Sequence, residues 1–212
     1  MNKSPDMPKQ CIYLVDDDDA LRDSLAWLLE SSGHNLCAFA SAEAFLEGLD
    51  EVERGCVLLD VRMGGMSGIE LFEQLRAQNF HLPVIFLTGH GEVPMAVEAL
   101  KRGAYDFIEK PFGDKQLISL VDAALKHERD AHDSFELRDE VERRFASLTQ
   151  REREVLRLIL AGRLNKQIAD ELSISIKTVE VHRARVMEKM SANSIAELVR
   201  DVMRIEPDFP TP

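Results

Sequence analysis

The sequence predicts an α/β fold, a doubly wound five-stranded parallel sheet, followed by a small all-α helix-turn-helix domain. Two observations support this class. Short apolar, β-prone runs alternate with amphipathic helical stretches over about the first 120 residues, which is the pattern of a parallel sheet covered by helices. From residue 147 onward the apolar residues follow only helical periodicity, so a second, all-helical domain is expected there.

The expected domain organisation follows from this change of pattern and from the two proline-containing ends of the chain. The predicted parts are a disordered tail at 1–9, an α/β domain at 10–126, a helical linker at 127–146, a helix-turn-helix domain at 147–205 and a disordered tail at 206–212.

Composition and charge indicate where such a chain works. No apolar run approaches the roughly 18 residues of a membrane-spanning helix, and the N-terminus lacks the apolar core of a signal peptide, so we expect a cytoplasmic protein with no membrane partner. Residues 148–212 hold 11 Lys and Arg against 10 Asp and Glu, which leaves 15 against 28 before them. Residues 1–147 thus carry a net charge of −13 and residues 148–212 a net charge of +1, which together give −12. Two domains with different partners are therefore expected, and a local basic face suffices for nucleic acid.

The three cysteines are Cys11, Cys37 and Cys56. They show no metal-binding spacing, are odd in number, and two of them lie in or beside predicted strands. We therefore expect buried free thiols and assign them no function.

The first predicted strand, Cys11–Val15, is followed directly by four aspartates and an amphipathic helix. Asp18 and Asp19 are explained as helix-start charges, one of them capping the helix. Asp16 and Asp17 are explained less well in this way, because they follow a buried strand, where like charges repel and need a cation.

The other elements alternate with a short period. The remaining predicted strands are 35–39, 57–60, 83–87 and 106–109. The predicted helices between and after them are 41–49, 68–78, 94–102 and the stretch from 114 onward. Right-handed crossovers then place every strand C-terminus at one edge of the sheet.

That edge gathers a set of reactive side chains. Asp60 ends the third strand, Asp16 and Asp17 follow the first, and Thr88 and Lys110 follow the fourth and fifth. The carboxylates can hold Mg²⁺ (or Mn²⁺), and the hydroxyl and ammonium groups can bind phosphoryl oxygens. Asp60 is then expected to be the nucleophile that forms an acyl phosphate. A strand-end carboxylate taken alone would more often be a helix cap or a loop acid.

These residues carry a resemblance to a known family. The motifs are Val15-Asp16-Asp17, Leu59-Asp60-Val-Arg-Met-Gly-Gly-Met-Ser-Gly68, Leu87-Thr88-Gly-His-Gly91 and Lys110-Pro111. Together they resemble the receiver domain of two-component response regulators. The resemblance implies that Asp60 accepts a phosphoryl group from a sensor histidine kinase. It also implies that the protein is not an enzyme, because a receiver catalyses only its own phosphotransfer and dephosphorylation.

The same resemblance assigns roles around Asp60. It implies that Asp17 binds Mg²⁺ directly, that Asp16 helps directly or through water, and that the Arg62 backbone carbonyl completes the metal shell. Thr88 and Tyr105 match the pair that switches the signalling face of receivers. Packing of the Tyr105 ring on the last helix is an equally open interpretation.

Two further points stay open at this stage. The Lys110-Pro111 peptide is compatible with either isomer. The family usually has Pro where Gly64 stands, so the loop after Asp60 is expected to be looser.

An aspartyl phosphatase of the haloacid dehalogenase type also uses a strand-end nucleophile, but it requires an acid where this chain has Arg62.

The segment 126–145 is mostly charged, and 114–161 holds neither Gly nor Pro. Such a run is often a flexible linker, but helix continuation is favoured here. Asp139 with Arg143 and Glu140 with Arg144 form i,i+4 pairs in the favourable order.

The second domain begins with a capping box, Thr149 with Glu152, that starts a helix ending near Gly162. Asn165 is expected to cap a short helix, and the turn 173–175 leads into a helix at 176–190. Two helices joined by a short turn form a helix-turn-helix.

The second of these helices can be divided by angle. At 100° per residue Ile176, Val179, Val186 and Met190 face inward, and the opposite face is where bases would be read. A mixed-charge outer face that merely solvates a small bundle is the alternative. Arg183 falls near the buried face and is expected to reach a phosphate. The candidate DNA-binding residues are Asn165, Lys166, Lys177, Thr178, Glu180, Val181, His182, Arg183, Arg185 and Lys189.

Three motifs of this domain carry a second resemblance. They are Leu148-Thr-Gln-Arg-Glu-Arg-Glu-Val-Leu156, Asn165-Lys-Gln-Ile-Ala169 and Ser175-Ile-Lys-Thr-Val-Glu-Val-His-Arg183. They resemble the LuxR-type DNA-binding domain, and the domain order resembles the FixJ-like branch of the NarL/FixJ family. The resemblance implies a DNA-binding transcription regulator that binds double-stranded DNA, with two half-sites, and that activates transcription through RNA polymerase by analogy. A receiver that only dimerises and is never phosphorylated is the alternative.

Phosphorylation can control DNA binding by unmasking the DNA-binding domain or by pairing receivers into a homodimer. If 114–145 is helical throughout, it spans about 48 Å at 1.5 Å per residue, which favours pairing over masking. Pairing is expected through the face formed by 94–102, 106–109 and the helix from 114.

Overall fold

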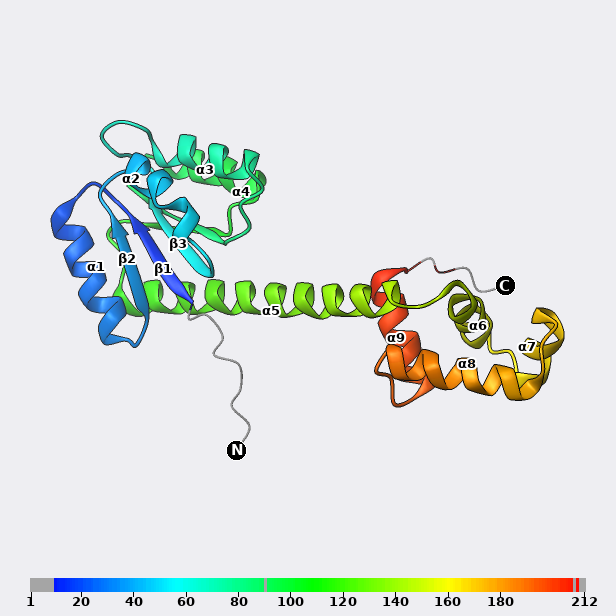
Figure 1. Ribbon diagram of the computed structural model, residues 1–212. Helices are drawn as coiled ribbons and strands as arrows, with labels where there is room; N and C mark the ends of the chain where they lie inside the picture. The colour runs from blue at the N-terminus through cyan, green and yellow to red at the C-terminus, as the bar shows by residue number, and fades with distance from the viewer. Residues whose placement is uncertain (1–9, 90, 208, 210–212) are drawn as a thin grey trace. The chain divides into compact units, whose positions relative to one another are not determined.

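The computed structural model describes residues 10–89, 91–207 and 209 (Figure 1). The predicted tail at 1–9 and most of the tail at 206–212 lie outside these residues. Within the described part of the chain, no helix is both long and apolar enough to cross a membrane. The chain forms two compact units, Met1–Ala131 and His132–Pro212, which are described separately.

The first unit contains the predicted five-stranded sheet. All neighbouring strands are parallel, in the order β2-β1-β3-β4-β5, which confirms the doubly wound fold. The strands are β1 (Cys11–Val15), β2 (Asn35–Phe39), β3 (Gly55–Asp60), β4 (Val84–Thr88) and β5 (Asp106–Glu109).

Helices cover both faces of this sheet (Figure 1). The core residues show that α2, α3 and α4 pack on one face, and that α1 and the first half of α5 pack on the other. The helices are α1 (Asp19–Ser31), α2 (Ala42–Glu47), the 3₁₀ helix η1 (Leu49–Glu51), α3 (Gly68–Ala77), α4 (Val93–Lys101) and α5 (Asp114–Ala146).

Strand alternation explains why two cores form. Successive side chains of a strand point to opposite faces, so Val57 and Leu59 join one core while Leu58 joins the other. All six residues of β3 are buried, as expected for the central strand of a sheet covered on both faces. Burying each large apolar side chain contributes about 1.5–3 kcal/mol. The functional edge is thus held by a strand that is buried along its whole length.

Local signals set the helix ends near that edge. Asp18 caps α1 by accepting hydrogen bonds from the amides of Ala20 and Leu21, which confirms the predicted cap. Ser67 and Glu70 form a capping box that starts α3. These caps fix where the chain leaves β1 and where it re-enters a helix after β3.

The segment Asp114–Ala146 is helical throughout, as favoured from its charge pattern. Arg143 pairs with Asp139 and Arg144 with Glu140 along its surface. Within the first unit, the buried Glu128 of α5 pairs with Arg54 at 3.0 Å. The sequence gives no sign of this pair, because the partners are 74 residues apart and belong to no periodic pattern.

The second unit is a small helical bundle. Its helices are α6 (Gln150–Leu160), α7 (Asn165–Leu172), α8 (Ile176–Lys189) and α9 (Ile195–Ile205). The predicted capping box of Thr149 and Glu152 is present. Phe209, which the sequence placed in the disordered tail, is 9% exposed and packs edge to face on Phe145. The bundle thus recruits an aromatic side chain beyond α9.

Two predictions for this unit are wrong. Asn165 is the first residue of α7 and not its cap: Leu164 takes the cap position, and its amide donates to Oε1 of Gln167 at 2.8 Å. Ile176 is 47% exposed and does not face inward, whereas Val179 and Val186 are buried as predicted. The angular argument assumes that neighbours cover the whole helix, and Ile176 is the first residue of α8.

A glycine pair tests how tightly the sheet edge is built. Gly55 begins β3 with φ of +138°, and a Cβ there would lie 1.7 Å from the carbonyl oxygen of Cys11. We expect Gly55→Ala to reduce the free energy of unfolding by about 3 kcal/mol or more, because strain and a backbone clash add. Gly33 also has positive φ, but nothing lies within 4 Å of its Cβ position, so Gly33→Ala should cost only about 1–2 kcal/mol. Denaturant unfolding followed by far-UV circular dichroism measures both, and equal losses would contradict the packing argument.

Candidate functional site

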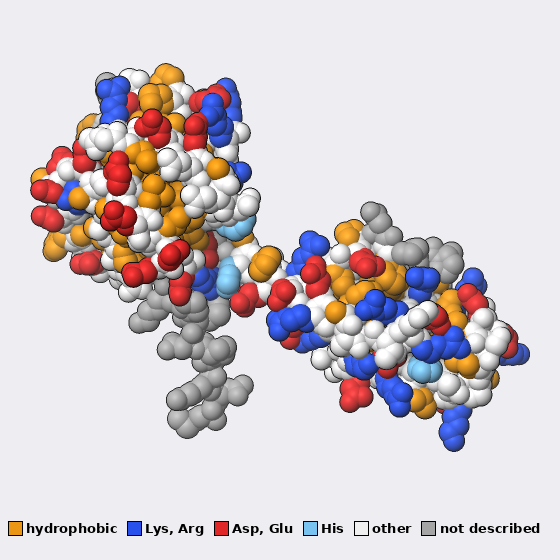
Figure 2. Space-filling view, turned by 45° about the horizontal axis from the view of Figure 1, so that its top comes forward, with side chains coloured by type: hydrophobic (Ala, Val, Ile, Leu, Met, Phe, Trp, Pro, Cys, Tyr) orange, Lys and Arg blue, Asp and Glu red, His pale blue; other side chains and the backbone are white. Residues whose placement is uncertain are grey.

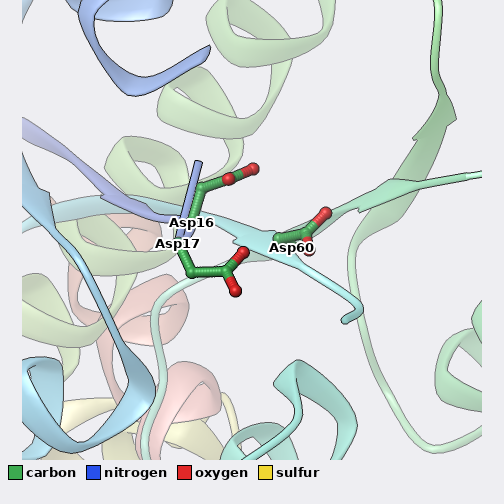
Figure 3. A group of neighbouring side chains, drawn as sticks. All are labelled: Asp16, Asp17 and Asp60. Carbon is green, nitrogen blue, oxygen red and sulfur yellow. The ribbon is translucent and has the colours of Figure 1, made fainter. Parts of the chain in front are cut away.

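The fold brings three carboxylates to one point. β1 and β3 are neighbours at the place where the strand order reverses, and their C-terminal ends lie side by side there. Asp16 and Asp17 follow β1, and Asp60 ends β3. Figure 3 shows the three side chains as neighbours that extend to the same side of the sheet edge. One carboxylate oxygen from each lies within 4.8 Å of the others.

Lys110, which follows β5, reaches into this cluster. Its Nζ lies 3.0 Å from Oδ2 of Asp16 and 2.5 Å from Oδ1 of Asp60. Burial raises the pKa of Asp60, and the Asp16 charge adds to the rise, while Lys110 opposes it. Burial alone would lower the pKa of Lys110, but its hydrogen bonds to the two carboxylates raise it, so the ammonium stays charged. The Lys110-Pro111 peptide is cis.

Backbone amides orient each carboxylate. The Gly64 amide donates to Oδ2 of Asp17 at 2.8 Å, and the Arg62 amide donates to Oδ2 of Asp60 at 3.1 Å. The Asp18 amide donates to Oδ1 of Asp16 at 2.9 Å. These donors fix the carboxylates in place without neutralising them. The cluster therefore keeps an excess of negative charge, and its oxygen donors could hold a hard divalent cation.

Thr88 and Tyr105 lie differently from one another. Thr88 ends β4, is fully buried, and its hydroxyl donates to the Ile108 carbonyl at 3.4 Å. Tyr105 is half-buried, and its ring lies 5.2 Å from the ring of His127 on α5. In this conformation Tyr105 thus takes the packing role that the sequence left open.

One acid near the site was not found from the sequence. Glu92 is buried, accepts a hydrogen bond from the Gly89 amide at 2.6 Å and pairs with Arg62 at 2.7 Å. It therefore connects the loop after β4 to the loop after β3. Its spacing of three from Gly89 was the only available signal, and a loop acid so placed is too common to single out.

The second unit carries the predicted helix-turn-helix. Ser173 follows the last residue of α7 and caps its C-terminus in the left-handed conformation, with φ of 53°. Ser175 caps α8 by accepting from the Thr178 amide at 3.1 Å. The outward side of α8 is solvent-exposed, as the angular division predicted. Its exposed residues are Lys177, Glu180, Val181, Ala184, Arg185 and Glu188.

The candidate DNA-binding residues that flank this side of α8 differ in their solvent exposure. Lys166 is exposed, while Asn165, Thr178, His182 and Arg183 are half-buried. The Thr178 hydroxyl lies 2.8 Å from that of Ser175. In the part of the chain that the structure describes, Nδ1 of His182 is buried without a hydrogen-bond partner.

Lys189, predicted to contact DNA, instead bonds to groups of its own domain. Its Nζ lies 2.7 Å from the buried carboxylate of Glu152 and donates to the Ser147 carbonyl at 3.1 Å. The ammonium group is thus committed within the domain. Lys189 is therefore not among the DNA contacts proposed for this domain.

The surface charges follow the division into units. In the face shown in Figure 2, acidic side chains are spread over the first unit, and Lys and Arg side chains are frequent over the second.

An acidic α/β unit with a carboxylate cluster, joined to a helix-turn-helix unit, defines a regulator with a phosphoryl-accepting input and a DNA-binding output.

Comparisons with known proteins agree with this class. Residues 12–122 match the response regulator receiver domain, and residues 146–202 match the luxR family of bacterial regulatory proteins. The transcriptional regulatory protein FixJ of Bradyrhizobium diazoefficiens is 49% identical over 91% of this chain and 94% of its own length. The response regulator protein TodT of Pseudomonas putida is 43% identical over 92% and 86%.

Solved structures give the same result. The response regulator StyR superposes with a TM-score of 0.85 at 43% identity, covering 92% of this chain and 99% of its own. Full-length FixJ from B. japonicum has a TM-score of 0.60 at 48% identity, covering 93% and 97%. This chain belongs to the response regulators that join a receiver domain to a LuxR-type DNA-binding domain. It is a phosphorylation-dependent DNA-binding regulator.

The Glu152–Lys189 pair gives a pH test. The hydrogen bond from Lys189 lowers the pKa of Glu152 from 4.5 to about 2. Because the folded-state pKa lies below the unfolded one, the carboxylate stabilises the domain above about pH 4.5, and this stabilisation is lost as pH falls toward 2. We expect Glu152→Gln to lower the free energy of unfolding at neutral pH by about 2 kcal/mol. The free energy of unfolding should also fall less steeply below pH 4.5 in this variant, which is the acid limb of its pH profile.

The matched control is Glu154→Gln, on the same helix, whose half-exposed pair with Arg151 is worth at most about 1 kcal/mol. Far-UV circular dichroism follows both units together. Hydrogen exchange measured by mass spectrometry on peptides of α6 and of β3 assigns the loss to one unit, because these peptides belong to different units. An unchanged acid limb in Glu152→Gln would contradict the assignment.

Proposed function

We propose that Asp60 is the phosphoryl acceptor, with a sensor histidine kinase as donor. The observation that carries the proposal is the convergence of Asp60 with Asp16, Asp17 and Lys110 at the switch point of the sheet. In the transfer, an Asp60 carboxylate oxygen forms a bond to phosphorus while the phosphorus–nitrogen bond of the donor phosphohistidine breaks. The receiver thus catalyses only its own phosphorylation and dephosphorylation.

The proposed cofactor is Mg²⁺ (or Mn²⁺), held by Asp16, Asp17, Asp60 and the Arg62 backbone carbonyl. Three carboxylates with excess negative charge suit a hard cation. When bound, the cation neutralises charge that develops on the transferred group. Lys110 is placed to contact a phosphoryl oxygen, since its Nζ already lies against Asp60.

Thr88 supplies the switch in this proposal. Its hydroxyl is bonded to the Ile108 carbonyl at 3.4 Å, a long contact that a phosphoryl oxygen at Asp60 could replace. Tyr105 would then change its packing against His127. The two side chains belong to β4 and to the residue before β5, so a change at Thr88 is transmitted to the α4 and β5 side of the domain.

The proposed output is pairing of phosphorylated receivers into a homodimer through α4, β5 and α5. Met95 and Val97 of α4 are large apolar side chains that are 41% and 39% exposed, and a partner receiver would cover them. Pairing raises the effective concentration of the second DNA-binding domain at an adjacent half-site. Activation of transcription through RNA polymerase extends the proposal by analogy with transcriptional regulators such as FixJ.

The proposed DNA interface is the exposed side of α8. Lys177, Val181 and Arg185 follow one another at spacing four and are exposed. Arg185 or Lys177 can pair with guanine edges, and Val181 can touch a thymine methyl. Glu180 lies on the same face. Asn165, Lys166, Thr178, His182 and Arg183 are the flanking residues proposed to contact phosphates.

The first test is chemical. Incubation with acetyl phosphate and Mg²⁺ should phosphorylate the full-length protein, and Asp60→Asn should abolish the labelling because the nucleophilic oxygen is lost. Asp17→Asn should weaken Mg²⁺ binding and slow labelling about tenfold or more. Asp19→Asn is the matched control: it belongs to the same acidic run but is 90% exposed, and it should label normally.

Intact-protein mass spectrometry measures the label, and sedimentation measures the expected dimer. Labelling that survives in Asp60→Asn would move the acceptor elsewhere. A labelled protein that remains monomeric would contradict receiver pairing without affecting the acceptor assignment.

The second test separates base reading from phosphate contact. Arg185→Ala should lose discrimination at particular base pairs by about 1–3 kcal/mol. Lys166→Ala should weaken binding to all sequences alike and reduce the salt slope by about 0.9. Binding to an operator and to random DNA at several salt concentrations distinguishes the two. If Arg185→Ala weakens both DNAs equally, then Arg185 contacts phosphate.

A further inference from the structure

Two thiols of the receiver lie in direct contact, away from the carboxylate cluster. Cys11 begins β1 and Cys37 is the middle residue of β2, and their Sγ atoms are 3.2 Å apart. In the register of the two strands Tyr13 pairs with Cys37. Side chains alternate along a strand, so Cys11, Tyr13 and Cys37 lie on the same face of the sheet. All three cysteines of the chain are free thiols, as predicted.

The expectation that these thiols are buried holds only for Cys56. Cys37 is exposed and Cys11 is half-buried. β2 lies at the edge of the sheet, where neighbouring elements cover few of its side chains. Burial, together with the neighbouring Cys37, raises the pKa of Cys11 to about 12. Cys11 therefore stays protonated near neutral pH and donates its S–H to the sulfur of Cys37. Cys37 is the thiol that meets a dissolved oxidant first.

We propose that Cys11 and Cys37 form an oxidant-sensitive dithiol site that closes to an intramolecular disulfide when a peroxide is the oxidant. The Cys37 thiolate attacks the peroxide: a sulfur–oxygen bond forms, the oxygen–oxygen bond breaks, and the leaving hydroxide takes up a proton as water. The Cys11 sulfur then attacks the resulting sulfenic acid. A sulfur–sulfur bond forms, the sulfur–oxygen bond breaks, and the hydroxyl leaves with the Cys11 proton as water.

Cys11 pairs with Asn35 in the strand register, so Cys11 and Cys37 are diagonal neighbours with Cα atoms about 7–8 Å apart, and closing the bond requires β2 to move. A disulfide has a sulfur–sulfur distance of about 2.05 Å, so the two atoms must approach by about 1.1 Å from the observed 3.2 Å. β2 pairs only with β1, and three of its five residues are exposed, so it can shift with little disturbance of the core. The Cys11 proton is directed at Cys37, where it can leave with the departing hydroxyl.

The bond would tie the strand that positions the metal-site acids. It would close the segment 11–37, which contains all of α1 and both Asp16 and Asp17. The tie lies at the start of β1, and the carboxylates follow its end. The dithiol site is therefore separate from the proposed acceptor, and its test does not depend on phosphorylation.

The test uses reduced full-length protein, native and without metal, treated with hydrogen peroxide and then quenched with an alkylating reagent. We expect two of the three thiols to be lost in the monomer, with a peptide containing a Cys11–Cys37 disulfide, and both thiols to return with dithiothreitol. Cys56, which is 0% exposed, should stay a thiol throughout and is the internal control.

Two single variants separate the steps. In Cys37→Ser, a change at an exposed position, Cys11 should stay reduced at the same peroxide dose. In Cys11→Ser, Cys37 should stop at sulfenic acid and be trapped by dimedone. The proposal is overturned if wild-type Cys37 becomes a sulfinic acid or joins a second chain while Cys11 stays a thiol. It is also overturned if neither thiol reacts at a dose that oxidises free cysteine.

Discussion

The receiver is built around mutual repulsion among three carboxylates. Asp16, Asp17 and Asp60 hold oxygens within 4.8 Å of one another, and each charged pair at that separation costs roughly 3–4 kcal/mol at an effective dielectric constant of about 20. One ammonium group, that of Lys110, and three backbone amides oppose this repulsion. A negative excess remains, and it suits the divalent cation proposed for this cluster.

The rest of the first unit supplies the rigidity that this arrangement needs. β3 is buried along its whole length and pairs with a strand on each side, so the backbone of Asp60 cannot move away from Asp16 and Asp17. Gly68, at the start of α3, lies so close to β3 that a Cβ would come within 2.0 Å of the Asp60 carbonyl oxygen. The Glu92–Arg62 pair connects the loop after β4 to the loop after β3, which follows Asp60 directly. Packing therefore holds charges together that would separate in a more flexible scaffold.

What could be predicted from the sequence follows from short-range rules. A strand ending in a carboxylate, a helix cap or an i,i+4 pair involves neighbours along the chain, so the sheet, the convergence of the three carboxylates and the capping box of Thr149 and Glu152 could be predicted. Partners that are distant in sequence leave no such pattern: Arg54 with Glu128, and Lys189 with Glu152, are visible only in the structure. The exposure of Cys37 depends on strand order, which periodicity does not give.

The charge division between the units constrains how phosphorylation can act. The residues before Leu148 carry −13 and those from it onward +1, so the receiver repels DNA and the contacts must come from the second unit. A phosphoryl group adds further negative charge to the receiver, which by electrostatics alone would weaken DNA binding. Stronger DNA binding after phosphorylation therefore requires a contact that differs between the two states, either an inhibitory contact that is released or a pairing contact that is formed. A receiver–receiver contact meets this requirement, because it adds a second DNA-binding unit without requiring the acidic domain to approach the phosphates.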